Sequence, residues 1–324
     1  MRVLPSVVLG AAALLLLAPT SAFQPRLRAA ASQREPPAVQ APTVGHSAAS
    51  LQELKDATYR GVEEAGDSFT LTNGRWEGKP YAPGGASRPT VTFVRDFRLT
   101  GDLDGDGSDE AIVLLGANAG GSGEMAYLAA VGHAGGTRRN IATARVGDRA
   151  QVRDARVEAR RIVFDVVQAG EGDAACCPGD LVRRSWALVE GMLKEGAPVK
   201  TGRLTIDTLA GSEWVLRAWS WDEPAPLAPP VTLKLDGSRL VGNAGCNNYF
   251  AAVTSGGAPG DIKVGAAGST RKMCPEAEMT VEQRFLQQLG GATRLQFVGG
   301  QLALSYAKPD KSAGVMLFDR SPAR

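Results

Sequence analysis

Short runs of apolar and β-branched residues, separated by glycine-rich turns, recur along most of the chain and constrain its fold more than any other feature. Such runs are typical of antiparallel strands, and the pair Asn73-Gly74 is a common hairpin turn. Ala111–Leu115 is apolar at every position, which favours a central strand buried on both faces. Residues 51–195 therefore predict a β-rich fold that opens with a short helix at 51–59. The other expected strands are 69–71, 91–94, 97–99, 125–131, 141–146, 152–157, 162–167 and 181–188.

The second half of the chain continues this pattern and adds one clear helix. Thr280 and Gln283 have the spacing of a capping box, an apolar stripe follows as far as Leu289, and Gly290-Gly291 ends the pattern. The predicted fold class is β-rich α+β with two domains, each an antiparallel sheet, and with one helix packed on the second sheet. The expected strands are 214–216, 231–235, 240–241, 295–297 and 302–306, the last two forming a hairpin.

Length and composition agree with two folded domains. The 324 residues exceed twice a typical domain of ~150 residues, and 44% apolar residues suffice for a core in each half. The pattern weakens at 196–208, where we place a linker between a β-rich domain at 51–195 and a second domain at 209–320. The net charge of +2 gives no cationic field for phosphates, so nucleic acid is not an expected partner.

The N-terminus predicts export. Arg2 precedes the apolar run Val7–Ala18, which is too short to cross the ~30 Å apolar core of a bilayer. Small residues up to Ala22 suit a signal peptidase, so we expect a signal peptide at 1–22 that is cleaved after Ala22. Residues 23–50, rich in Pro, Ala and Ser, are interpreted as a disordered linker. The predicted location is the periplasm or cell envelope, or outside the cell, with no transmembrane anchor after cleavage; an uncleaved membrane anchor is the alternative.

The acidic segment 101–110 is the best candidate for ligand binding. Its carboxylates alternate along the chain as oxygen donors, and a cation would relieve their repulsion. An EF-hand is excluded because the twelfth position lacks the required Glu, but the spacing resembles the calcium loops of FG-GAP-type repeats. We expect either a bound Ca²⁺ or an acidic β-turn that binds no ion, and the protein requires no other cofactor. The residues that would bind the ion are Asp102, Asp104, Asp106, Ser108 and Glu110.

The four cysteines fall into two pairs, one in each predicted domain. A bridge between Cys246 and Cys274 would close a loop of about 29 residues and stabilise the fold by roughly 3.6 kcal/mol in the chain-entropy model. Cys176 and Cys177 are adjacent, so their Cα atoms lie about 3.8 Å apart, below the ~4.4 Å usual for a disulfide. A strained vicinal bridge, a redox switch and two buried thiols all remain open for this pair.

Three motifs in the second half are familiar. Leu209–Trp214, Gly242–Phe250 with its Gly-Cys-Asn signature, and Ser269–Pro275 resemble the META domain, or HslJ, family over about residues 209–319. The resemblance implies an incomplete-barrel-like sheet with one helix, found in exported bacterial envelope proteins linked to heat shock and novobiocin resistance, with no known catalytic residues. The first half resembles the domain that precedes META modules in some exported bacterial proteins.

The resemblance implies a non-enzymatic, stress-associated binding protein of the cell envelope, whose partner is an envelope protein or a lipid. Trp219 and Trp221 are candidates for an apolar binding surface, with core packing as the alternative role. The alternative function is calcium-dependent ligand binding or adhesion through the first domain. A hydrolase that uses Asp165, Glu171 and Asp173 would need two of them paired at a defined separation, and the sequence shows no such pair.

Overall fold

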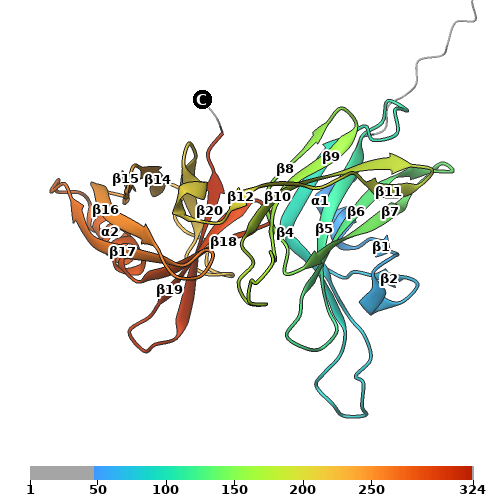
Figure 1. Ribbon diagram of the computed structural model, residues 1–324, viewed down its shortest axis with the longest axis horizontal. Helices are drawn as coiled ribbons and strands as arrows, with labels where there is room; N and C mark the ends of the chain where they lie inside the picture. Colours follow the sequence, from blue (N-terminus) through green and yellow to red (C-terminus); the bar gives the residue numbers. More distant parts are fainter. Residues whose placement is uncertain (1–46, 323–324) are drawn as a thin grey trace, which may run out of the picture. The chain divides into compact units, whose positions relative to one another are not determined.

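Antiparallel β-sheets make up most of the part of the chain that the structure describes (Figure 1). The computed structural model describes residues 47–322. The predicted signal peptide and the predicted linker up to residue 46 lie outside these residues. The described residues all belong to one compact unit, and the predicted domain boundary at 196–208 stays a prediction. Within residues 47–322, no helix is both long enough and apolar enough to cross a membrane.

Two sheets form the first part of the fold. Their strand orders are β3-β4-β5-β6-β7 and β11-β10-β9-β8, with β12 also paired to β10. The N-terminal elements, including the small β1–β2 sheet, precede them in the chain. The bounds are α1 (Leu51–Lys55), β1 (Thr58–Tyr59), η1 (Glu63–Ala65), β2 (Phe69–Thr70), β3 (Arg75–Glu77), β4 (Thr90–Gly101), β5 (Glu110–Asn118), β6 (Met125–Ala134), β7 (Thr137–Asp148), β8 (Gln151–Glu158), β9 (Arg161–Gln168), β10 (Asp180–Val189), β11 (Met192–Glu195) and β12 (Val199–Arg203).

Strand β5 is central in its sheet and buried on both faces, which confirms the prediction for Ala111–Leu115. Ile112 belongs to the core between the two sheets, together with Phe164 of β9. Val113 points the other way, into a second cluster that Leu54 of α1 joins. Because burying such a side chain contributes roughly 1.5–3 kcal/mol, the N-terminal elements stabilise the outer face of this sheet.

The helix predicted at 51–59 is shorter than expected. It ends at Lys55, and Thr58–Tyr59 forms β1, paired with β2. Tyr59 is fully buried and its hydroxyl donates to the Leu54 carbonyl oxygen at 2.7 Å. Burying this ring in the core outweighs the weak local helix preference. At the other end Ser50 caps the helix, so the last residues of the predicted linker are ordered.

Another segment also differs from the prediction. The strands expected at 91–94 and 97–99 are one strand, β4, with a register shift where Arg95 and Asp96 adopt φ of 46° and 56°. Such an irregularity kinks the strand without ending it. The predicted linker at 196–208 contains β12, which pairs with β10 through the register Arg183 to Val199.

The second part of the fold is one eight-stranded sheet with the order β17-β16-β15-β14-β13-β20-β19-β18. This sheet curls into a half-barrel. Its two edges approach each other where Leu295 of β18 donates its N–H to the carbonyl oxygen of Gly260, just before β17, at 2.8 Å. The bounds are η2 (Ile206–Leu209), β13 (Glu213–Ala218), β14 (Thr232–Asp236), β15 (Arg239–Asn243), β16 (Asn248–Ser255), β17 (Ile262–Ser269), α2 (Glu276–Gly290), β18 (Ala292–Val298), β19 (Gln301–Ala307) and β20 (Ala313–Arg320).

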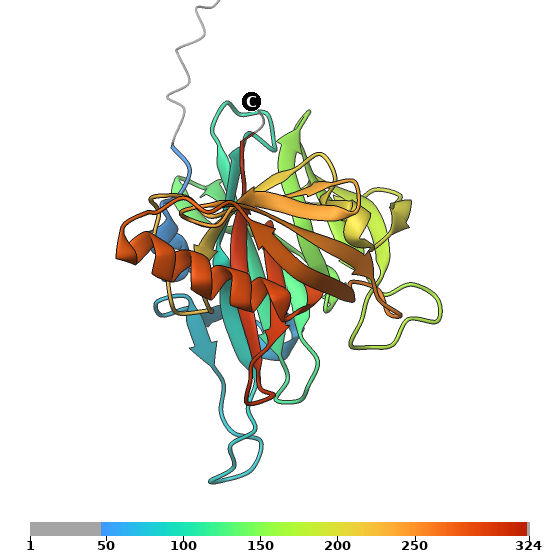
Figure 2. The same cartoon turned by 90° about the vertical axis from the view of Figure 1, so that its left-hand side faces the viewer.

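Helix α2 lies across the strands of this sheet (Figure 2). Its apolar stripe is confirmed, because Phe285 and Leu289 are fully buried. The predicted capping box is wrong: the helix begins at Glu276, and the Thr280 hydroxyl donates to the Glu276 carbonyl oxygen at 2.9 Å from inside the helix. Pro275 precedes the first turn, where the N–H that proline lacks would have no partner within the helix. The negative charge of Glu276 in the first turn interacts favourably with the positive end of the helix dipole.

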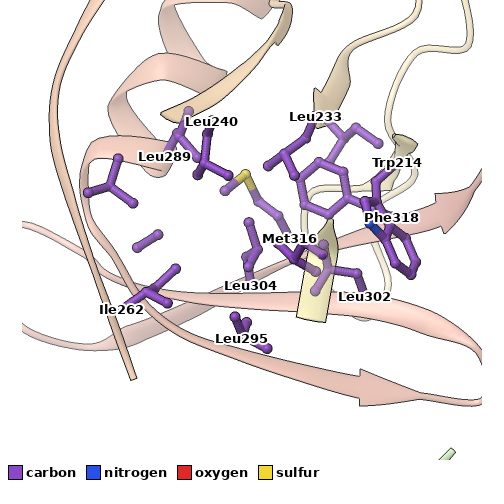
Figure 3. Close-up of a cluster of buried hydrophobic side chains, with 14 of the residues drawn as sticks. Trp214, Leu233, Leu240, Ile262, Leu289, Leu295, Leu302, Leu304, Met316 and Phe318 are labelled. Carbon is purple, nitrogen blue, oxygen red and sulfur yellow. The ribbon is translucent and has the colours of Figure 1, made fainter. Parts of the chain in front are cut away.

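The core of the half-barrel gathers side chains from its strands and from α2, including the fully buried Trp214, Leu289 and Phe318 (Figure 3). Strands β18 and β19 form the predicted hairpin. Gly299 and Gly300 at its tip both have positive φ, 56° and 88°, a conformation that glycine adopts without strain.

Candidate functional site

The three aspartates of the acidic loop lie close together. Asp102, Asp104 and Asp106 each offer a carboxylate oxygen, and these oxygens lie within 4.8 Å of one another. Backbone N–H groups of the loop orient them: Gly105 donates to Asp102 at 2.5 Å and Ser108 donates to Asp106 at 2.7 Å. A hard cation such as Ca²⁺ prefers oxygen ligands of this kind. Calcium binding here stays a prediction.

The other two predicted ligands of the loop are buried. Ser108 is 7% exposed and Glu110 is 2% exposed. Burial raises the pKa of Glu110 to about 7, although a hydrogen bond from the Leu103 N–H at 2.8 Å acts in the opposite direction. The structure thus brings together the three aspartates, while the Glu110 carboxylate braces the backbone at the start of the loop.

Both predicted cysteine pairs lie at disulfide distance. The Cα atoms of Cys246 and Cys274 are 6.0 Å apart, and the pair ties the turn after β15 to the segment before α2. The adjacent Cys176 and Cys177 have their Cα atoms 3.8 Å apart, in the loop between β9 and β10.

A buried asparagine beside Cys246 holds three segments together. The Asn247 Oδ1 accepts hydrogen bonds from the Thr270 hydroxyl at 2.8 Å and from the Lys272 N–H at 2.7 Å. Its Nδ2 donates to the Glu282 carboxylate of α2 at 3.0 Å, and the Asn247 N–H donates to the same oxygen at 2.9 Å. Because Asn247 is only 5% exposed, this network fixes the turn, the cysteine-bearing segment and the helix relative to one another.

Trp219 and Trp221 line a groove of about 580 Å³. The Trp219 ring is 4% exposed and packs under the Arg284 guanidinium, 4.5 Å from its centroid, so most of this ring belongs to the core. Trp221 is 48% exposed and offers its ring to the groove. Arg95 of β4 fixes this residue, because it lies 5.6 Å from the ring centroid and donates to the Trp221 carbonyl oxygen at 3.0 Å.

The walls of this groove combine apolar and polar side chains. Val94 of β4 and Phe297, Val298 and Val315 of the half-barrel supply apolar surface, while Glu124 and Lys308 supply opposite charges. A smaller pocket of about 240 Å³ shares several of these residues and reaches Cys176 of the vicinal pair. The groove is therefore suited to a ligand with an apolar body and polar groups at its margins.

A comparison with protein families identifies the second part of the fold. The model of the META domain family matches residues 207–321. These residues are a META domain. The half-barrel and its packed helix fall within the matched range.

Among solved structures, a protein from Burkholderia xenovorans determined by NMR is 27% identical to this chain. The match covers 36% of this chain and 86% of that protein, with a TM-score of 0.28. No curated protein matches the chain. The family match ends at the META domain and leaves the first part of the fold unassigned.

In the META domain, sequence reasoning missed the role of Asn247 and its partner Glu282. The signal was present, since Asn247 directly follows Cys246 in the Gly-Cys-Asn signature. An asparagine in a turn is usually read as a turn former. Here its side chain is buried and carries the network, because its amide group both donates and accepts hydrogen bonds.

Two of the three carboxylates that a hydrolase would use, Asp165 and Asp173, are engaged with arginines. Asp165 accepts a hydrogen bond from Arg183 at 2.8 Å; burial raises the pKa of Asp165, but this bond and the charge of Arg183 more than compensate, so the pKa is lowered. Hydrogen bonds from Arg203 lower the pKa of Asp173 to about 2. Both carboxylates brace the first part of the fold, and Glu171 is exposed in the same loop as Asp173.

Proposed function

We propose that this META domain protein is an exported, non-enzymatic cell-envelope protein that binds a partner through the groove lined by Trp219 and Trp221. The single observation that carries the proposal is the exposed Trp221 ring. Trp221 is 48% exposed, yet Arg95 contacts both its ring and its carbonyl oxygen, which restricts the residue before a ligand arrives. Such a preorganised aromatic side chain is typical of residues that dominate binding.

The chemistry of the groove indicates the class of partner. Its apolar residues favour an aliphatic or aromatic segment, and Glu124 and Lys308 give opposite charges at which backbone or head-group polar atoms could pair. An apolar segment of another envelope protein and the acyl chain of a lipid both meet these requirements.

Site-specific photo-crosslinking tests this proposal. A photoreactive amino acid replaces Trp221 in the producing cells, and the matched control replaces Leu227, which is 68% exposed and does not line the groove. We expect a discrete adduct at position 221 that is absent at position 227. A protein adduct and a lipid adduct differ in mass and so separate the two partner classes. Equal labelling at both positions, or no adduct at position 221, would contradict the proposal.

Export is tested separately, by mass spectrometry of the mature protein. Cleavage after Ala22 leaves Phe23 as the first residue. Recovery of the intact leader in a membrane fraction would contradict this part of the proposal.

A second function is favoured by the acidic loop. Three carboxylate oxygens within 4.8 Å of one another support calcium-dependent ligand binding or adhesion through the first part of the fold. The two functions separate in one experiment, because chelation of calcium would abolish binding through the acidic loop and leave the crosslink at position 221 unchanged.

A further inference from the structure

The vicinal cysteines lie at the surface of the loop between β9 and β10, and their two sulfur atoms are in different surroundings. Cys176 is exposed, whereas Cys177 is 6% exposed. The Cys246–Cys274 pair differs, since Cys246 is 4% exposed and Cys274 is half-buried. Cys176 is thus the most accessible of the four cysteines, and it also lines a pocket of about 240 Å³, so an incoming thiol can approach this residue without any opening of the fold.

The loop that carries this pair is held at both ends by one carboxylate. Asp173 accepts hydrogen bonds from the N–H groups of Gly170 and Gly179, both at 2.8 Å, and from Arg203 at 2.6 Å. None of these contacts involves a sulfur atom. Cleavage of the bond between Cys176 and Cys177 would thus leave the loop in place, which permits repeated opening and closing.

A cation lies next to the buried sulfur. Arg294 of β18 donates from Nη1 to the Cys177 Sγ at 2.9 Å. The same guanidinium donates to Asp261 at 2.7 Å, which fixes its position. A guanidinium at this distance stabilises a thiolate, and a thiol whose anion is stabilised is the better leaving group in thiol–disulfide exchange.

We propose that Cys176 and Cys177 form a redox-active site that exchanges electrons with a dithiol reductant, in addition to the binding function proposed above. One thiolate of the dithiol attacks the Sγ of Cys176 and forms a mixed disulfide. The bond between Cys176 and Cys177 breaks, and its electron pair goes to the Cys177 sulfur as a thiolate beside Arg294. The second thiolate of the dithiol then attacks the sulfur that the dithiol contributed to the mixed disulfide, and an internal disulfide forms in the reductant. Cys176 leaves as a thiolate that takes a proton from water, so the dithiol loses two electrons and the cysteine pair gains two.

The first test compares the two cysteine pairs within one molecule. The mature, oxidised protein is incubated with limiting dithiothreitol, quenched with an alkylating agent at intervals and mapped by mass spectrometry. We expect Cys176 and Cys177 to be reduced at least about tenfold faster than Cys246 and Cys274, because exchange rates follow access to the attacked sulfur and the quality of the leaving group. Equal rates, or a faster reaction of the Cys246 pair, would overturn the proposal.

The second test removes the cation. Arg294→Gln and Asp261→Asn both abolish the Arg294–Asp261 ion pair. The asparagine keeps an oxygen that accepts the hydrogen bonds of Arg294, so the guanidinium stays beside Cys177, whereas Arg294→Gln removes it. We expect reduction of the vicinal pair to slow by about tenfold in Arg294→Gln, the size expected for loss of one hydrogen bond to a charged sulfur, and to keep its rate in Asp261→Asn. The Cys246 pair serves as internal reference in each variant, so a change in overall stability is visible. Equal rates in the two variants would overturn the role of Arg294.

The third test identifies the sulfur that is attacked. A brief reaction with glutathione, quenched with acid, traps the mixed disulfide. The proposal requires the glutathione on Cys176, and an adduct on Cys177 would contradict the order of steps.

Discussion

Replacement of Asn247 by alanine should loosen the META domain without altering the first part of the fold. The change deletes the amide that joins the turn after β15 to Thr270, Lys272 and Glu282. The cavity left is small, so the loss is mainly one of hydrogen bonds to groups that the fold has already desolvated.

The expected magnitude follows from these contacts. A neutral hydrogen bond contributes about 1 kcal/mol net, and one to a charged group about 1.5–3 kcal/mol. Thr270 and Lys272 are exposed, so water replaces part of what Asn247 supplied to them, whereas the carboxylate of Glu282 loses a close donor at 3.0 Å. We expect a loss of about 2–4 kcal/mol in the free energy of unfolding of the META domain.

Hydrogen exchange followed by mass spectrometry measures this loss locally, which matters because a chain of this size need not unfold in two states. Amides of β15, β16 and α2 should exchange about 30- to 900-fold faster in Asn247→Ala, the factor equivalent to about 2–4 kcal/mol. The control is Asn248→Ala, whose exposed side chain accepts only a 3.3 Å hydrogen bond from Asn243. If both variants exchange at the same rate, the network is not what fixes the turn.

Three further predictions concern the cysteine bridge and the acidic loop. Cys246→Ser should lower the free energy of unfolding of the META domain by about 3.6 kcal/mol, because the unfolded chain gains the entropy of a loop closed over 28 residues of separation. Urea unfolding measures this loss, and Cys274→Ser should show the same loss. Calcium at 100 times its Kd should add about 2.7 kcal/mol to the free energy of unfolding and raise the melting temperature by several degrees, more than magnesium does. An equal rise in the Asp104→Ala variant would exclude the site. Folding raises the pKa of Glu110 from 4.5 to about 7, so the folded state binds the extra proton and stability falls as pH rises through this interval. Glu110→Gln should abolish that fall, worth up to about 3 kcal/mol, in urea unfolding compared at pH 5 and pH 8; an unchanged pH profile would mean that Glu110 ionises normally.

Much of the fold follows from local patterns, and the errors show where such patterns stop. The apolar run Ala111–Leu115 predicts a central strand because both of its faces need partners, and β5 has them. The prediction for Thr280 is wrong because Thr followed by Gln at capping distance also occurs inside helices, where the hydroxyl donates to a carbonyl oxygen of the preceding turn. The end of α1 depends on where Tyr59 is buried, which only the tertiary fold decides.

The candidate site was predictable in its residues but not in their environments. The spacing of Asp102, Asp104 and Asp106 predicts that they converge, whereas the burial of Glu110 depends on the neighbouring strands. The same limit applies to Cys177, since its contact with Arg294 joins residues 117 positions apart in the chain. Sequence spacing predicts which residues close together in the chain converge, but the charges that distant segments bring to a site can be predicted only from the fold.

The position of β13 in the half-barrel has a consequence for biosynthesis. This strand, the first of the META sheet, pairs with β14 on one side and with β20, the last strand of the chain, on the other, as in the register Trp214 to Arg320. In a chain that lacks residues 313–320, β13 would carry a row of unpaired backbone groups, and so would β19. A chain truncated before β20 would thus expose two strand edges at once, and such edges recruit other chains. The eight residues of β20 therefore decide whether the edges of β13 and β19 are covered, and a synthesis product that lacks them would be prone to aggregate.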